Sequence, residues 1–331
     1  MIKMLLVFLL FYSCAITPPP APTPTPEESS VFMPIEDIFK DLNENKSNKA
    51  ATKMMRTKAD NDRLMKLVPL KIFFPEGEKK SHKAFPVAEL KLKVDLRSND
   101  TPIKDQDDGK CTAFAGVAAL ETNIGNKIVL SSWDAWGKYR VYACESFVDA
   151  LVLKDNRICE EMDYPQYGSR SSRCNLNRST YLSDVQDLGS DLNGIVGTLN
   201  AGRVVYIGMS TPNDVVACKK VVNPKNGFAN GGHAMVVVGY LTDPSLPNEV
   251  VGIIRNSWGS DCGDKGYHYM PLSIIKKAGA YFNAWDFKSV VSNLETPPPS
   301  IPPILPTPEP KCAQWKRLWY APWKWTCAVW E

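Results

Sequence analysis

Two proline-rich stretches determine which part of this 331-residue chain can fold into a core. Six prolines lie between Pro18 and Pro26 and eight between Pro297 and Pro310, more than half of the 26 in the chain. Proline has no backbone N–H to donate to a helix or sheet, so we expect both stretches to be stiff, extended linkers. The sequence therefore divides into residues 1–14, a linker at 15–30, a helix-prone region at 31–92, a main domain at 93–295, a second linker at 296–310 and a tail at 311–331.

The first residues have the pattern of an export signal. Lys3 supplies a positive charge, and residues 4–12 form an apolar run of the length that signal peptides use. The run ends at Ser13-Cys14-Ala15, which resembles the bacterial lipoprotein signal, in which Cys14 would be lipidated. The alternatives are ordinary signal cleavage after Ala15 and a buried strand of a cytosolic domain. We expect an exported protein of the bacterial cell envelope, either lipid-anchored, periplasmic or secreted.

Charge and hydropathy argue against two classes of function. The net charge is only +3, and no stretch combines clustered Lys and Arg with aromatic side chains, so nucleic-acid binding is not expected. No apolar run reaches the roughly 18 residues that a transmembrane helix needs.

Nine cysteines favour an oxidising compartment. None of them form a C-x-x-C pair, so the sequence predicts no metal site, and we expect no cofactor. Cys14 and Cys111 have other expected roles, which leaves seven. Because seven is odd, at least one thiol is expected to stay unpaired.

The apolar pattern predicts a mixed fold. Residues 34–68 have patchy helical periodicity, with Asn61-Asp62 as the expected cap of a second helix, and form either a pro-region over a cleft or a helical spacer. The main domain is expected to hold helices at 111–122 and 191–200 and strands at 204–209, 234–240 and 250–254. Because helices come first and strands later, we expect an α+β fold with two lobes.

The histidines indicate which cysteine chemistry is available, because a cysteine nucleophile needs a base and a group that orients the base. His82 lies in a basic loop and is expected to be solvated, and His268 alternates with tyrosines as a strand surface position would. His233 follows Gly231-Gly232 and precedes an apolar strand, so its ring is expected to stay open at the strand start. Cys111 begins a predicted helix, whose N-terminal N–H groups favour a thiolate.

Four segments, in this order, resemble the papain family of cysteine peptidases over the length of the main domain. They are Val94-Asp95-Leu96-Arg97 with Ile103-Lys104-Asp105-Gln106; Cys111-Thr112-Ala113-Phe114-Ala115; Gly232-His233-Ala234-Met235-Val236-Val237-Val238-Gly239-Tyr240; and Arg255-Asn256-Ser257-Trp258-Gly259 with Gly263-Asp264-Lys265-Gly266-Tyr267. The resemblance implies a two-lobed papain-like fold, with the nucleophile helix in a helical lobe and the histidine and asparagine in a β-rich lobe.

The resemblance also implies a role for each matching residue. Cys111 would attack the peptide carbonyl as a thiolate, and His233 would protonate the leaving amine. Asn256 would accept a hydrogen bond from the imidazole, and Trp258 would shield that bond from water. Gln106 would donate to the oxyanion beside the backbone N–H of Cys111.

The resemblance also implies that Trp258, Gly232 and Ala234 contact the substrate, and that the substrates are proteins or peptides.

The pattern departs from the family in four places. The loop before Cys111 is one residue shorter and carries Asp107-Asp108; Thr112 and Cys262 each replace a tryptophan; and the glycine-rich cleft segment is not recognisable. The sequence therefore predicts the chemistry without the specificity.

Two pairs of cysteines are disulfide candidates. Cys159 and Cys174 flank Tyr164-Pro165 in a way that resembles a family disulfide; Cys144 is a competing partner, and unpaired core thiols are the alternative. Cys312 and Cys327 bracket most of a tail rich in tryptophan (Trp315, Trp319, Trp323, Trp325 and Trp330). That tail is expected to contact the cell wall or a membrane surface, or to pack on its own domain.

The predicted function is a cysteine endopeptidase that hydrolyses protein peptide bonds through a thiolate–imidazolium pair. Two rival functions remain open. One is hydrolysis of peptidoglycan peptides, which the run Asn256-Ser257-Trp258-Gly259 argues against because it matches peptidases of proteins. The other is a non-catalytic envelope protein that binds through its tail, which the presence of Cys111, His233 and Asn256 together argues against.

Overall fold

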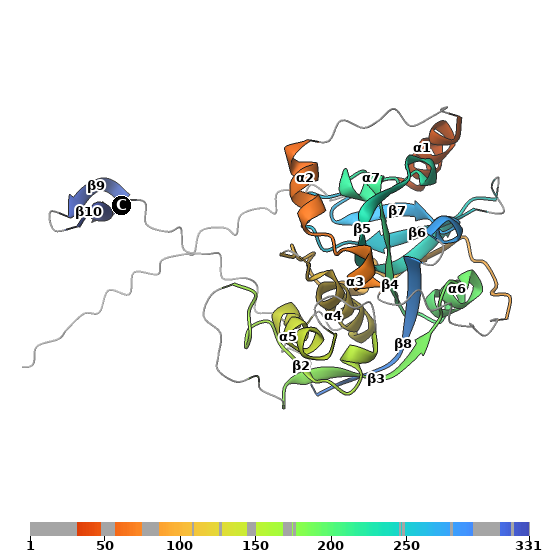
Figure 1. Ribbon diagram of the computed structural model, residues 1–331, viewed down its shortest axis with the longest axis horizontal. Coiled ribbons are helices and arrows are strands. Elements are labelled where there is room, and N and C mark those ends of the chain that lie inside the picture. The colour runs from red at the N-terminus through yellow and green to blue at the C-terminus, as the bar shows by residue number, and fades with distance from the viewer. Residues whose placement is uncertain are drawn as a thin grey trace, which may run out of the picture.

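The computed structural model describes most of the main domain and part of the region before it (Figure 1). The described residues are 32–47, 57–74, 86–107, 109–125, 128–143, 150–167, 174, 177–244, 246, 249–278, 281–293, 312–318 and 321–330. The predicted signal with Cys14, both linkers, His82 and Cys144 lie outside them. No helix of this described part is long and apolar enough to cross a membrane.

The helical lobe is built around a buried helix that begins at the predicted nucleophile. Its elements are α4 (Cys111–Ile124), α5 (Ser132–Ala143) and the short 3-10 helix η2 (Ala150–Leu153). Alanines favour the helical backbone of α4, and Gly125 ends it in the left-handed conformation, with φ of 69°. Helix α4 packs against α5 on one side and against the sheet on another, so nearly all of its residues are buried.

The second lobe is an antiparallel sheet with the strand order β2-β3-β8-β4-β5-β6-β7, in which β1 also pairs with β5. The strands are β1 (Lys93–Asp95), β2 (Ile158–Cys159), β3 (Ser179–Asp187), β4 (Val205–Pro212), β5 (Phe228–Thr242), β6 (Val250–Arg255), β7 (Tyr267–Pro271) and β8 (Phe282–Ser292). Short helices connect or flank them: α6 (Leu192–Asn200), α7 (Asn213–Val216), α8 (Ile274–Ala278), η1 (Arg97–Asn99) and η3 (Pro224–Asn226). The prediction of an α+β fold with two lobes is confirmed.

Among the described residues before the main domain are three helices: α1 (Ile35–Ser47), α2 (Lys58–Met65) and α3 (Leu70–Phe73). The cap predicted at Asn61-Asp62 is wrong, because both residues lie inside α2. The helix begins earlier since Thr57 forms a capping box with Asp60: the Thr57 hydroxyl accepts from the Asp60 N–H, and the Asp60 carboxylate accepts from the Thr57 N–H.

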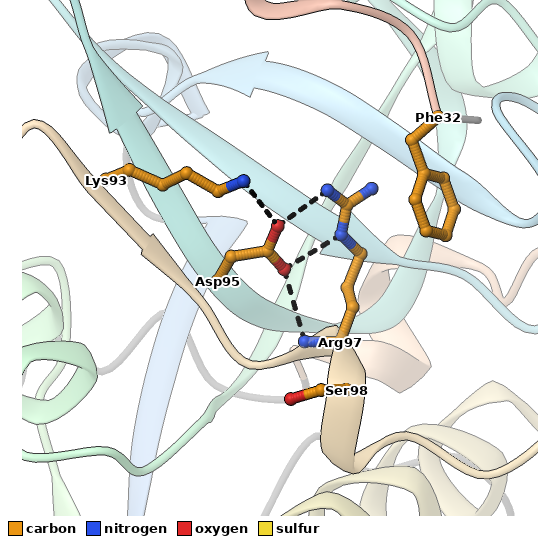
Figure 2. A pocket seen from close by; sticks show the side chains of 5 residues that line it. All are labelled: Phe32, Lys93, Asp95, Arg97 and Ser98. Carbon is orange, nitrogen blue, oxygen red and sulfur yellow. Dashed lines mark hydrogen bonds and ion pairs between the residues drawn. The ribbon is translucent and has the colours of Figure 1, made fainter.

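The N-terminal region packs on the main domain at a pocket of about 650 Å³ lined by Phe32, Lys93, Asp95, Arg97 and Ser98. Figure 2 shows the Asp95 carboxylate between Lys93 and Arg97, and both cations are paired with it, at 3.2 and 2.7 Å. The Arg97 guanidinium lies 3.8 Å from the centre of the Phe32 ring. The cationic guanidinium on the ring face anchors Phe32 in this pocket.

The tail contains an antiparallel hairpin of β9 (Cys312–Leu318) and β10 (Ala321–Trp330). Its register places Cys312 opposite Trp330 and Cys327 opposite Trp315. The two cysteines are therefore not direct cross-strand neighbours, and their disulfide stays a prediction.

Candidate active site

Cys111 is a buried, unpaired thiol at the first residue of α4. Burial raises its pKa to about 12, although backbone N–H groups of Ala234, Thr112 and Cys111 itself act against that shift. The contact with Ala234 places the sulfur beside strand β5, at the residue that follows His233.

His233 lies in β5 with its ring fully buried. Its Nε2 is 2.8 Å from Oδ1 of Asn256, and because an amide oxygen only accepts, Nε2 carries the hydrogen. Nδ1 has no hydrogen-bond partner among the described residues, so it is available to exchange a proton with a thiol. Burial lowers the pKa of His233 to about 4, against the hydrogen bond with Asn256.

The sheet register brings His233 and Asn256 together although 23 residues separate them. Strands β5 and β6 pair antiparallel with Val236 opposite Arg255, so the start of β5 and the end of β6 lie at the same edge. Trp258 stacks on His233 with ring centres 4.4 Å apart, and it covers the imidazole as the resemblance implies.

Gln106 joins this site through a short bridge to the asparagine segment. Its N–H donates to the carbonyl of Ser257 at 2.8 Å, and its side-chain Oε1 accepts from the Ser257 hydroxyl at 2.5 Å. This leaves the Nε2 group facing away from Ser257, with the carbonyl of Lys66 at 3.5 Å as its neighbour. The side-chain amide is thereby oriented by Ser257, a residue that the sequence did not single out.

Residues 66–74, here called the covering segment, lie over the site. Val68 and Gly232 exchange two backbone hydrogen bonds, of 3.1 and 2.7 Å. Phe73 is fully buried against Gly232, where an added Cβ would lie only 2.2 Å from its ring. Lys66 Nζ pairs with Asp105 at 2.6 Å. The thiol and the imidazole are consequently shut off from water.

His268 corrects a prediction, because it is fully buried instead of lying on a strand surface. Residues 219–222 run along β7 and cover it: the N–H of Tyr269 donates to the carbonyl of Lys220 at 2.7 Å. The Nε2 atom of His268 lies 3.1 Å from the side-chain nitrogen of Asn256, so this histidine is a direct neighbour of the site. The alternation of His268 with tyrosines in the sequence did not indicate that this histidine lies next to the site.

Two disulfides are present in the described residues. Cys159 is joined to Cys174, one of the candidate pairs, and Cys218 is joined to Cys262, which the sequence did not single out as a pair. Asp134 lies near Cys159 and Cys174 with a spacing that metal ligands can have. Both sulfurs are taken up by the disulfide, however, so they offer no thiolate to a metal.

Comparison with known proteins shows which family this chain resembles. The model of the papain family cysteine protease matches residues 90–281. Peptidase 1 of Psoroptes ovis is 30% identical over 196 residues, which are 53% of this chain and 59% of that protein. Falcipain-3 of Plasmodium falciparum is 28% identical over 206 residues, 52% of this chain and 39% of that protein. The chain thus spans about half the length of these curated relatives.

Solved structures have the same fold. The Amb a 11 cysteine protease of ragweed pollen in its proform superposes with a TM-score of 0.55 at 19% identity, covering 76% of this chain and 85% of that one. Xylellain from Xylella fastidiosa superposes with a TM-score of 0.53 at 22% identity, and the match covers 71% of this chain and 98% of that one. The family model accounts for more than half of the chain, and the chain therefore belongs to the papain family of cysteine proteases.

Proposed function

We propose that this chain is a cysteine endopeptidase in which Cys111 is the nucleophile and His233 its proton partner. The observation that carries the proposal is the hydrogen bond of 2.8 Å between His233 and Asn256, under the Trp258 ring and beside the buried free thiol. This bond holds the hydrogen of the neutral imidazole on Nε2 and leaves Nδ1 unprotonated. Nδ1 is the atom that would accept the proton of the thiol.

The proposed reaction needs no group beyond these side chains and water. The Cys111 proton moves to Nδ1 of His233, and the thiolate attacks the carbonyl carbon of the peptide bond. The resulting oxyanion accepts from the Cys111 N–H and from Nε2 of Gln106. The imidazolium then gives its proton to the leaving amine, and a thioester remains on Cys111. His233 takes a proton from water, the hydroxide attacks the thioester, and the released thiolate regains its imidazolium partner.

Residues 31–92 are proposed to be a pro-region instead of a spacer. The support is the covering segment, which pairs its backbone with Gly232 and buries Phe73 there, so that a substrate cannot reach Cys111. The backbone pairing of Val68 also supports Gly232 as a substrate contact, because an extended peptide could use the same N–H and C=O groups. Activity would then require displacement or removal of this segment.

The test compares a denatured generic protein with purified cell wall as substrates, using the processed chain and its Cys111→Ala variant. Thiol-dependent cleavage of the denatured protein, lost in the variant, supports the endopeptidase. Release of peptides from cell wall alone would favour the peptidoglycan-peptide hydrolase. Activity that survives the Cys111→Ala change would rule out the assigned nucleophile.

The setting in the bacterial cell envelope is also a proposal. It is supported by the signal-like residues 1–14 and by disulfides, which persist in oxidising compartments. If Cys14 carries a lipid, the protein should partition into detergent and Cys14→Ser should release it. A water-soluble form that begins at Ile16 would establish ordinary cleavage instead.

The tail from residue 311 onward is proposed to dock the enzyme on cell wall or membrane surface and to take no part in catalysis. Its clustered tryptophans and cationic residues are typical of segments that sit at interfaces. Deletion after Pro297 should weaken attachment to envelope and leave cleavage of a small peptide unchanged. If small-peptide turnover disappears with the tail, the tail is part of the catalytic structure.

A further inference from the structure

His268 uses both of its ring nitrogens although it is completely buried in β7. Its Nδ1 lies 2.7 Å from the backbone carbonyl of Lys219. Its Nε2 lies 3.1 Å from Nδ2 of Asn256. The ring therefore bridges the backbone of the segment that covers β7 and the side chain that orients His233.

The partners of His268 fix where its proton is. A carbonyl oxygen only accepts, so Nδ1 carries the hydrogen that is donated to Lys219. In the neutral ring Nε2 then has a lone pair, which accepts from the Nδ2–H of Asn256. This leaves Oδ1 of Asn256 on the other side of the amide, where it accepts from Nε2–H of His233 and from the N–H of Ser257, both at 2.8 Å.

We propose that His268 is a positioning residue of the reaction: it holds the Asn256 amide in the one orientation that presents oxygen to His233. The inference rests on the proposed roles of Cys111, His233 and Asn256. If the amide rotated by half a turn, Nδ2–H would face Nε2–H of His233, donor against donor. The His233 imidazolium that forms during the reaction would then lose Oδ1 of Asn256 as its hydrogen-bond acceptor. The neutral His233 tautomer that receives the thiol proton would lose the same acceptor.

The surroundings of His268 hold its ring in place. The disulfide between Cys218 and Cys262 packs against the bridge, with Cys262 Sγ 3.9 Å from Nδ2 of Asn256 and 4.0 Å from Nε2 of His268. Cys218 also immediately precedes Lys219, whose carbonyl accepts from the ring. A Cβ at Gly263, where φ is 75°, would lie 2.2 Å from the carbonyl oxygen of Tyr267 and 3.0 Å from Cε1 of His268, so a glycine at this position leaves room for the ring.

This disulfide stands where the family pattern has a second tryptophan, at Cys262. In this chain, the disulfide and His268 together line the side of Asn256 that faces away from His233. The chain thus has a hydrogen-bonding ring next to its asparagine, so that the amide is held by a directional contact on each side.

His268 must be neutral to accept from Asn256. Burial lowers its pKa to about 4, while the carbonyl of Lys219 and the charge of Asp214 act in the opposite direction. Asp214 is itself paired with Lys219 Nζ at 2.8 Å. The other titratable group that interacts electrostatically with His268 is His233, on the far side of Asn256, and this interaction lowers the pKa of His233. The accepting form of His268 is therefore the dominant one at neutral pH.

The test compares His268→Leu, which removes the acceptor, with His268→Gln, which keeps one. We express the full-length protein, let it be processed, and measure kcat and KM per titratable Cys111 thiol. We expect kcat to fall about tenfold in His268→Leu with KM unchanged, as the loss of one hydrogen bond from an oriented pair predicts, and to recover largely in His268→Gln. Equal losses in both variants, or a normal kcat in His268→Leu, would overturn the proposal.

A double-mutant cycle separates positioning from general stability. Because His268 acts through Asn256, His268→Leu should have no further effect on kcat in an Asn256→Ala background. A full additional loss there would show that His268 acts by another route. Thermal unfolding of each variant identifies any loss that is merely structural.

A second measurement needs neither a folded variant nor activity. Nitrogen NMR of the unprocessed full chain should show His268 with Nδ1 protonated and Nε2 unprotonated. A protonated Nε2 at neutral pH would overturn the proposal. This readout is independent of the proposed function, which fails instead if Cys111→Ala or Asn256→Ala leaves peptide cleavage unchanged.

Discussion

At the scale of single residues, burial holds the reactive pair in its neutral form. The pKa of Cys111 rises to about 12 and that of His233 falls to about 4, and desolvation is the largest cause of both shifts. Two charges in this dry site would each lose hydration that their attraction does not fully restore. The proposed thiolate–imidazolium pair is therefore expected only when the covering segment is displaced and water reaches both groups.

Gln106 and His233 should differ in how much activity their loss removes. Loss of one oxyanion donor costs about 10²–10³ in turnover, so Gln106→Ala should be slow but measurable. His233→Ala removes the only base assigned to the thiol and should be at background. The measurement is kcat on a small peptide, per titratable thiol.

Gln186→Ala is the matched control, because Gln186 is half-buried in β3 and has no part in the site. It should retain normal turnover. Full activity of Gln106→Ala would mean that the shortened loop before Cys111 leaves the oxyanion to another donor.

At the scale of elements, the covering segment is held by one aromatic anchor and one backbone bridge. Phe73 and Phe39 are both buried aromatic residues of the N-terminal region, at 0% and 4% exposure, but only Phe73 packs on Gly232. Truncation of a buried Phe typically costs about 3–5 kcal/mol. Phe73→Ala should therefore uncover Cys111 in the unprocessed chain and speed its alkylation at least about tenfold, since 1.4 kcal/mol is a factor of ten.

Phe39→Ala, in helix α1, removes the same side chain away from Gly232. We expect it to lower the thermal stability of the chain without a comparable rise in the alkylation rate. If both variants expose the thiol equally, α1 and the covering segment are released as one unit.

The covering segment should also be released by acid. His233 has a pKa of about 4 when covered, against an ordinary value of 6.5, and uncovering returns its ring to water. In the Cys111→Ala chain, in which no thiol can pass its proton to the ring, the uncovered form binds more protons than the covered form between pH 6.5 and 4. The stability of the covered form is therefore present above pH 6.5 and is lost as the pH falls towards 4. The protection factor of the Val68 amide against hydrogen exchange should decrease over this range.

His233→Gln is the control for that pH dependence, because glutamine does not titrate. The protection factor at Val68 should then be nearly flat from pH 6.5 to 4. A decrease of unchanged size in His233→Gln would assign the acid sensitivity to other groups.

At the scale of the whole molecule, a buried charged network joins the two lobes. Arg255, at the end of β6, donates to Asp100 at 3.3 Å and to the carbonyl and hydroxyl of Thr101 at 2.9 Å each. From helix α4, the Thr122 hydroxyl donates to Asp100, and the Glu121 carboxylate lies 3.8 Å from Arg255. The residue before Asn256 is thereby tied to the helix that carries Cys111.

Removal of Arg255 should destabilise the whole fold. Arg255→Met leaves the buried carboxylate of Asp100 without its cation, while Glu121 keeps Lys104 at 2.8 Å, and loss of one partner of a buried pair costs about 3–5 kcal/mol. Arg178→Met is the matched control, because Arg178 pairs with Glu160 and the Arg178 side chain is more than half exposed. Ion pairs with an exposed partner contribute about 1 kcal/mol or less to stability. Urea unfolding measures both, and equal losses would contradict the role assigned to the network.

The sequence by itself determined the features that depend on neighbours along the chain. The helix at Cys111, a strand over residues 234–240 and the α+β class follow from local periodicity and glycine positions, and the structure has all three. Strand β5 begins earlier, at Phe228, and the His233 ring that was expected to stay open at a strand start is buried inside it. The resemblance to papain-like peptidases also came from short segments, and the family match bears it out.

Only the tertiary structure decided which side chains meet. His268 has the alternation of a surface strand, yet residues 219–222 and the disulfide of Cys218 with Cys262 cover it, because burial depends on what packs on a strand and not on its own pattern. Helix α2 is capped at Thr57 and not at Asn61-Asp62, because Thr57 and Asp60 can form a capping box and Asn61-Asp62 lie inside the helix. The covering of Cys111 by residues 66–74 likewise depends on contacts between distant segments, which no local period encodes.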